Sequence, residues 1–243
     1  MSGESHRGHR AEPAGTWERA RRLRADARRN LERILDAARE VFAELGPYAP
    51  LDEVVRRAGV GAGTLYRRFP DRQSLLRAVA MDTWARLIDE ADRALAEEVN
   101  AFDALSRYMH RAVDLRVGAV MPSLMGAMPM DGEMQSAASR SAEAAQQLLT
   151  AAWEEGSLRR DVTFGDIGLL LIRMSRPMPS PFPRELDNAL AHRHLELCIE
   201  GLRAINANRP LAGPTMTLED LRSLPSDASR TSPEIEHPHR QQQ

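Results

Sequence analysis

The chain has 243 residues, of which 42% are hydrophobic and 5% aromatic, and its formal net charge is −2. One cysteine excludes a disulfide framework and a thiolate metal cluster, and no apolar run reaches the ~18–20 residues of a membrane span. Ala, Leu and Arg dominate, which favours helices over sheets. We therefore expect an all-α, cytoplasmic protein without a membrane partner, metal or cofactor. Cys198 lies in a helical apolar pattern, as an inert core residue would.

Charge is distributed unevenly along the chain. Residues 1–70 contain 14 Arg and 10 Asp or Glu, a net charge of +4, whereas residues 71–243 contain 19 Arg and 25 acidic residues, a net charge of −6. The basic end is therefore the candidate for nucleic-acid binding, and the acidic remainder argues against general polyanion binding. Every basic residue is Arg, whose guanidinium can contact phosphate or guanine in a bidentate manner.

Residues 1–27 are polar and include the Arg-rich stretch that follows Trp17. One interpretation is a solvated, disordered tail. The alternative is a basic arm that touches phosphates or a minor groove beside the main site. Both interpretations remain open at this stage.

Two helices are predicted next. Apolar residues recur with helical spacing from Leu31 to Leu45, which predicts a helix over about 27–45 that ends at Gly46-Pro47. A second, short helix over 51–58 ends at Gly59, because glycine adopts the left-handed helix-terminating conformation at almost no cost.

A third, very short helix over 62–69 follows this glycine turn. Leu65 and Phe69 are four residues apart and can face inward together, which leaves Thr64, Tyr66 and the two arginines that follow it for the outer faces. A helix this short is unstable alone, so its neighbours must hold it in place. An anchored short helix that presents small residues, a tyrosine and two arginines suits entry into a DNA major groove.

The remainder of the chain is also predicted to be helical. Asp71 is a good N-cap for a long helix that continues to about Val99 and links two parts of the molecule. Further helices are expected over 102–117, 133–155, 164–174 and 184–207. Residues 118–132 should form short helical pieces and loop, residues 176–183 a Pro-rich connector, and residues 208–243 a mostly disordered C-terminal tail with a transient turn at 218–224.

Residues 28–79 resemble the DNA-binding domain of TetR-type (tetracycline-repressor family) transcription regulators. The resemblance is carried by the 31–45 stripe, by Gly63-Thr-Leu-Tyr-Arg-Arg-Phe and by the basic residue and Leu pair that follow. It implies an N-terminal three-helix helix-turn-helix DNA-binding domain (28–73), joined by a long helix to a larger helical ligand-binding and dimerisation domain (74–207). Dimerisation would use the helices at about 164–174 and 184–207.

The resemblance also implies DNA-contacting positions. Tyr66 would pack on the DNA backbone, Gly63 would allow close approach, and Arg72 stands where a lysine usually meets a phosphate. Two departures weaken the pattern: Gly61 replaces the usual Ser or Thr N-cap, and Pro50 stands where a threonine often caps the second helix. The predicted DNA-binding residues are Ala62, Gly63, Thr64, Tyr66, Arg67, Arg68 and Arg72.

A cluster of methionines within 121–134 has two compatible interpretations, plastic core filler or an adaptable wall for an apolar ligand. Asp114, Arg116 and Arg173 could orient a polar ligand group, or could be surface charges. The residues predicted to line a ligand pocket are Trp84, Ile88, Met109, Val113, Met121, Met125, Met128 and Met134.

Other kinds of site are not supported. The glycines at 59, 61 and 63 lack the third glycine of a dinucleotide-binding loop, because residue 64 is Thr. His192 and His194 are two residues apart and point to different helix faces, and His110 has Asp114 rather than histidine at i+4. No catalytic motif is present, so no enzyme is expected.

The predicted function is a homodimeric, sequence-specific transcriptional regulator. It would be a repressor that an apolar small-molecule ligand releases from a palindromic double-stranded DNA operator. Two alternatives remain: a helical small-molecule-binding protein without an operator, and a cryptic enzyme. The first predicts ligand binding without a specific DNA site, and the second predicts turnover.

Overall fold

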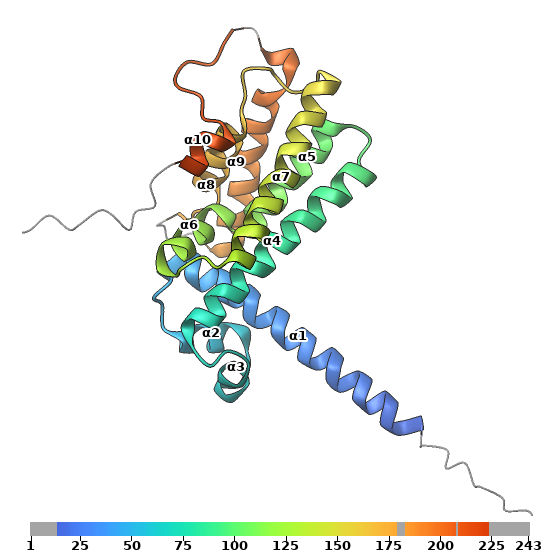
Figure 1. The fold of residues 1–243 in the computed structure, drawn as a ribbon, viewed down its shortest axis with the longest axis vertical. Helices are drawn as coiled ribbons and strands as arrows, with labels where there is room; N and C mark the ends of the chain where they lie inside the picture. Colours follow the sequence, from blue (N-terminus) through green and yellow to red (C-terminus); the bar gives the residue numbers. More distant parts are fainter. Residues whose placement is uncertain (1–13, 179–182, 208, 224–243) are drawn as a thin grey trace, which may run out of the picture.

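The computed structural model describes residues 14–178, 183–207 and 209–223, and helices dominate throughout (Figure 1). Part of the predicted connector and both chain ends, where disorder was predicted, lie outside these residues. The fold-class prediction, all-α, is confirmed within them; apart from helices there is one isolated antiparallel bridge, between Leu158 and Arg203. The helices are α1 (Ala14–Leu45), α2 (Leu51–Ala58), α3 (Ala62–Arg68), α4 (Arg72–Glu97), α5 (Ala101–Asp114), α6 (Val117–Ala127), α7 (Gly132–Glu155), α8 (Phe164–Met174), α9 (Arg184–Leu202), the 3-10 turn η1 (Ala204–Asn206) and α10 (Leu218–Ser223).

Helix α1 begins at Ala14, not near residue 27, so residues 14–27 are helical, and the prediction of a disordered tail is wrong there. Arg, Ala, Leu and Glu are strong helix formers, and they extend a helix whose packed part has already overcome the nucleation cost. The extension to Asn30 spans roughly 25 Å at 1.5 Å per residue. Figure 1 shows it projecting from the body, toward the same end of the molecule as α3.

The boundaries of α2, α3 and α4 follow local chemistry. Gly59 closes α2 with a φ of 60°, in the left-handed region, and the Val60 N–H donates to the Val55 carbonyl. The Asp71 carboxylate accepts from the Ser74 N–H at 2.7 Å, which forms one half of a capping box for α4. Pro50 and Gly61 begin α2 and α3 without any side-chain cap, as the two departures in the sequence predicted.

The first hydrophobic core is formed by α1, α2, α3 and the first half of α4, and it extends further than predicted. Val120, Met121 and Leu124 of α6, Met128 just after α6, and Met134 of α7 are buried in the same cluster as Ile34 and Leu65. The expected domain boundary between residues 73 and 74 therefore falls inside one continuous core. The three-helix unit does not enclose its own core, because α6 and the start of α7 complete it.

The second core is formed by the second half of α4 together with residues of α5, α7, α8 and α9. Phe102, Leu105, Leu148 and Leu195 are fully or almost fully buried there. Helix α4 thus contributes its first half to one core and its second half to the other. This arrangement makes α4 the rigid connection between the two ends of the molecule, as its length predicted.

Two segments are more ordered than the sequence suggested. Residues 117–127 form one helix that continues through Pro122, where short pieces were expected. Residues 209–223, predicted to be disordered, include α10, and the Met216 carbonyl accepts hydrogen bonds from the Gly165 N–H and the Thr163 hydroxyl. Contacts with the start of α8 therefore order this segment. Within the described residues, no helix is long and apolar enough to cross a membrane.

Candidate DNA-binding surface and apolar cavity

Helix α3 is held from below by two buried anchors. Leu65 is 0% exposed and Phe69 is 5% exposed, as their four-residue spacing predicted. From α1, the Arg33 guanidinium donates to the Gly59 carbonyl at 3.0 Å and fixes the turn that precedes α3. Burial of Leu65 on this seven-residue helix and of Phe69 at its C-cap compensates for the poor intrinsic stability of α3.

The outer side of α3 presents most of the predicted DNA-binding residues to solvent. Tyr66 is 45% exposed, Arg67 and Arg68 are exposed, and Thr64 is half-buried. Neither arginine forms an ion pair with another described residue, so both guanidinium groups are available to phosphates or bases. Ala62 and Gly63 are also exposed, and nothing stands within 4 Å of the position of a Cβ at Gly63. The surface is therefore small, flat and basic, with one aromatic ring.

Arg72 does not present a free side chain. Its Nη1 donates to the carbonyls of Pro47 and Ala49, at 3.0 and 2.6 Å, and thereby holds the loop between α1 and α2. This role competes with the predicted phosphate contact, because the same guanidinium must serve both. The contact with phosphate remains a prediction.

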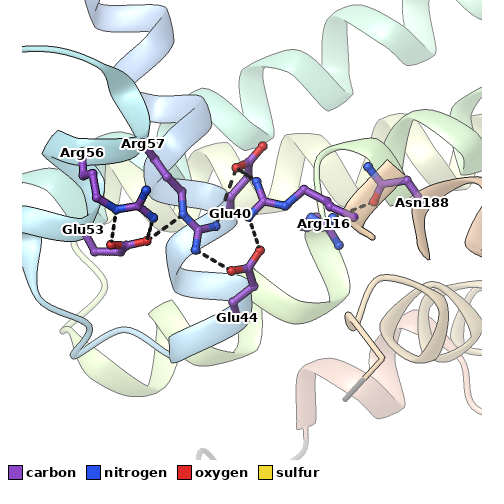
Figure 2. A network of polar contacts seen from close by, with 8 residues as sticks. Glu40, Glu44, Glu53, Arg56, Arg57, Arg116 and Asn188 are labelled. Atoms are coloured by element: carbon purple, nitrogen blue, oxygen red, sulfur yellow. Dashed lines mark hydrogen bonds and ion pairs between the residues drawn. The ribbon is translucent and has the colours of Figure 1, made fainter. Parts of the chain in front are cut away.

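A network of ion pairs joins α2 to α1. Glu53 accepts from Arg56 and Arg57, and these hydrogen bonds lower the pKa of its carboxyl to about 2 (Figure 2). Arg57 also binds Glu44 of α1, with 2.6 Å between Nη2 and Oε2. The arginines of α2 are thus committed to intramolecular pairs, in contrast to those of α3.

A large apolar cavity lies between α4, α5, α6, α7 and α8. Its volume is about 1040 Å³, comparable to the upper end of small-molecule sites. None of the described residues that line it carries a charged side chain. Its wall includes Trp84, Leu87, Tyr108, Met121, Met125, Met128, Ser141, Leu149, Phe164 and Ile167.

Half of the predicted pocket residues line this cavity: Trp84, Met121, Met125 and Met128. The other four predicted residues do not line it. Met109 and Met134 are buried among core side chains, Ile88 packs beside the second core, and Val113 borders a separate polar cleft. A helical stripe predicts which residues turn inward, but not which part of the interior is left empty.

Two hydroxyl groups give the cavity its polarity, and sequence reasoning missed both. Tyr108 on α5 is 6% exposed and Ser141 on α7 is 5% exposed, and neither hydroxyl bonds to another described residue. Burial raises the pKa of the Tyr108 phenol, so this group stays neutral. The available signal was a polar residue within an otherwise apolar helical stripe.

A smaller polar cleft of about 320 Å³ lies between α1, α4, α5 and α9. His192 lines this cleft and stacks on His110, and the Nδ1 atoms of the two rings are 2.7 Å apart. His110 also contacts Glu196, and His192 contacts Asp114. The histidine pair thus joins α5 to α9 across 82 positions of sequence, a relation that spacing within one helix could not indicate. No group of side chains suited to metal binding occurs among the described residues.

This arrangement, a supported short helix on a basic end with an apolar cavity in the helical body beyond it, defines a helix-turn-helix DNA-binding protein. Two family models match the chain: "Bacterial regulatory proteins, tetR family" at residues 34–79, and "Transcriptional regulator SbtR-like, C-terminal domain" at residues 100–204. The chain belongs to the tetR family of bacterial transcriptional regulators.

Individual relatives agree with this assignment. The solved TetR transcriptional regulator SCO0520 of Streptomyces coelicolor is 33% identical, with a TM-score of 0.52, over 71% of this chain and 97% of that one. The transcriptional activator FasR of Mycolicibacterium smegmatis is 38% identical over 84 residues (34% of this chain, 37% of FasR). The transcriptional repressor LfrR of the same organism is 42% identical over 67 residues (28% of this chain, 30% of LfrR). The match therefore spans less than half the length of these curated relatives.

Proposed function

We propose that this regulator is a homodimeric repressor that leaves a palindromic DNA operator when an uncharged, mostly apolar small molecule enters the cavity. The observation that carries the proposal is the combination of two features in one chain. The first is an exposed basic surface on a rigidly anchored α3, and the second is an apolar cavity connected to that surface by α4.

Several features of α3 support operator binding. Among the described residues, Arg67 and Arg68 have no ion-pair partner, whereas the arginines of α2 are paired, so α3 offers a basic surface to DNA. In a symmetric dimer, two such helices would enter successive major grooves roughly 34–36 Å apart. With about eight phosphate contacts per dimer, log K should fall with log salt concentration with a slope near −7.

The chemistry of the cavity supports an uncharged ligand. A charged group would lose its hydration without gaining an ion pair, because the described part of the wall has no ionisable side chain other than the neutral Tyr108 phenol. The hydroxyls of Tyr108 and Ser141 could bond one polar group of a ligand, while Trp84 and the methionines cover its apolar part. Met side chains adapt to ligands of different shape.

Helices α8 and α9 are the proposed dimer interface. Helix α9 carries exposed apolar side chains, among them Leu186 at 44% and Leu197 at 68% exposure, and Leu169, Leu170 and Ile172 of α8 are half-buried. Burial of such side chains against a second copy would stabilise a four-helix contact. The dimer places two copies of α3 on one face, as a palindromic site requires.

Selection of duplexes from a random DNA library, followed by affinity measurements, tests the DNA-binding part. We expect a palindrome to be enriched, and Tyr66→Ala or Arg67→Ala to weaken binding at least a hundredfold without changing the circular dichroism spectrum of the dimer. Unchanged binding by both variants would refute the assignment of α3 as the reading helix.

The fluorescence of N-phenyl-1-naphthylamine, an uncharged apolar probe, tests the cavity. We expect Ala142→Phe, which places a ring in the cavity, to weaken probe binding about tenfold. The exposed neighbouring variant Glu143→Phe is the control and should bind the probe normally. Equal probe binding by Ala142→Phe and wild type would show that the probe does not occupy this cavity.

The second candidate function, a helical small-molecule-binding protein without an operator, is favoured by the size of the cavity alone. It predicts probe binding by wild type together with no enriched duplex. The two experiments therefore separate the candidates.

A further inference from the structure

The first turn of α9 is tied to two other parts of the molecule. Arg184, its first residue, donates from Nη1 to Glu40 and from Nη2 to Glu44, the latter at 2.9 Å. Glu40 and Glu44 lie one turn apart on α1. Asn188, one turn farther along α9, accepts a hydrogen bond from Nη2 of Arg116 at 2.6 Å. Figure 2 shows Arg116 and Asn188 beside the carboxylates of α1.

The same two carboxylates also lie beside Arg57 of α2, in the part of the molecule that we call the reading domain (α1 to α3). Arg57 of α2 binds Glu44 firmly, but its Nη1 is 3.7 Å from Oε2 of Glu40. That Nη1 is buried and has no hydrogen-bond partner within the described part of the chain. Glu40 is therefore engaged by Arg184 and leaves Arg57 unsatisfied, although a buried unpaired donor is unfavourable. A second arrangement, in which Glu40 bonds to Arg57, becomes available when Arg184 withdraws.

The other contact of α9 leads to the cavity. Arg116 is only 9% exposed and has a φ of 49°, in the left-handed region that residues other than glycine rarely adopt. It is the N-cap of α6, whose first residues, Val117 and Gly118, line the cavity. Contacts thus run without interruption from the cavity wall through Arg116, Asn188, Arg184 and the carboxylates of α1 to α2.

We propose that Arg184 and Asn188 are positioning residues that transmit occupancy of the cavity to the reading domain, with Glu40 changing its partner from Arg184 to Arg57. This inference rests on the proposed function. In the ligand-free protein, the latch between Arg184 and the two glutamates fixes the orientation of α2 and α3 against α9, which preorganises the dimer for DNA. A ligand that displaces the start of α6 shifts Arg116 and, through their hydrogen bond, Asn188. This shift separates Arg184 from the two glutamates.

The ionisation of Glu44 is consistent with this role. Burial alone would raise the pKa of its carboxyl, but the hydrogen bond from Arg57 and the charges of Arg184 and Arg116 outweigh burial and lower it. Glu44 therefore stays negative near neutral pH. Because it keeps Arg57 bound in either arrangement, α2 remains attached to α1 while Glu40 changes partner.

The test uses the full-length protein and its selected duplex. We expect Arg184→Gln to weaken duplex affinity about tenfold per dimer, the scale of one partly exposed ion-pair fork lost in each subunit. Affinity for N-phenyl-1-naphthylamine should stay within twofold. Arg184→Lys should recover part of the loss, since one ammonium can reach one carboxylate. Arg160→Gln, which removes an exposed arginine elsewhere, is the matched control and should bind normally.

A second measurement follows the guanidinium of Arg57 by nitrogen-15 nuclear magnetic resonance, without DNA. We expect Arg184→Gln to slow hydrogen exchange at Arg57, because Glu40 moves onto its free Nη1. The double variant Glu40→Gln, Arg184→Gln should lose this protection, a dependence that general loosening of the fold would not produce.

The outcomes separate this inference from the proposed function. If wild type enriches no duplex, the proposed function fails, and the resonance measurement still decides the latch. If wild type binds its duplex but Arg184→Gln matches it within twofold, or Arg57 exchange is unchanged, the inference is overturned while the proposed function stands.

Discussion

The end of this molecule that carries α3 (the reading end) and the end that contains the apolar cavity (the cavity end) differ in how they follow from the sequence. Around α3, the turn, the inward anchors and the next helix cap come from residues within about fifteen positions of one another, namely Gly59, Leu65, Phe69 and Asp71. The cavity is formed by five helices separated by up to ninety positions, and no short stretch specifies it. A local motif can therefore be identified from sequence, whereas an empty volume depends on how distant helices pack.

The largest expected effect tests how strongly the reading end depends on local anchoring. Leu65→Ala removes a fully buried side chain from a seven-residue helix and should destabilise the protein by about 2–5 kcal/mol. Chemical denaturation measures this loss. Tyr66→Ala, on the exposed face of the same helix, is the control, and we expect it to change stability by less than about 0.5 kcal/mol. Similar losses for both variants would contradict the assignment of inner and outer faces.

The next effect tests how closely the cavity helices pack. A Cβ at Gly118 would lie 2.1 Å from the Ile172 Cα, so Gly118→Ala must push α6 away from α8. We expect a cost of about 1–3 kcal/mol in thermal or chemical unfolding. Gly126→Ala on the same helix meets nothing within 4 Å and should be neutral or stabilising. Equal stability of the two variants would indicate that α6 and α8 lie farther apart.

A smaller effect concerns the projecting part of α1. Residues 14–30 carry six arginines and two acidic residues, a net charge of +4, and Arg19 and Arg21 are exposed. If this extension contacts phosphates beside the operator, Arg19→Gln with Arg21→Gln should reduce the salt slope of duplex binding by about 2 per subunit. The exposed residue Arg140, changed to Gln, is the control for loss of charge. An unchanged slope would favour the alternative of a solvated extension.

The smallest effect is a pH dependence of the ion pairs of α2. The pKa of Glu53 is lowered to about 2, so its pairs with Arg56 and Arg57 stabilise the fold above the unfolded pKa near 4.5 and are lost as pH falls toward 2. We expect amide exchange in α2 to accelerate over this range. Glu53→Gln should remove that part of the pH dependence, whereas the acid dependence of α7, whose N-cap Asp131 has a pKa lowered by its hydrogen bond from Arg77, should remain.

Sequence reasoning was most reliable where one residue type has one physical role. Gly59 adopts the left-handed conformation, Asp71 caps α4, and Leu65 with Phe69 turns inward, each as predicted. Arg72 shows the limit of such reasoning, because its position suggested a phosphate but its guanidinium holds two backbone carbonyls. Nothing in the sequence near Arg72 identifies Pro47 and Ala49 as its partners.

The cavity was only partly predictable for a related reason. Methionine content correctly drew attention to Met121, Met125 and Met128, but the same signal included Met134, which fills core space instead. Tyr108 and Ser141 lie on helices whose apolar stripes were predicted, but the sequence pattern did not identify their hydroxyl groups as part of the cavity wall. The start of α1 was missed because composition alone does not distinguish a solvated helix from a solvated coil.

The shared core has a practical consequence for engineering. Met121 and Met128 belong to the buried cluster beneath α3 and also form part of the cavity wall, so one layer of side chains serves both regions. A chimera that joins residues 1–79 to an unrelated sensor would leave the buried cluster around Ile34 and Leu65 without Val120 and Leu124, which belong to the same cluster. A portable DNA-reading module from this chain must therefore include α6, which means that it brings part of the original sensor's specificity with it.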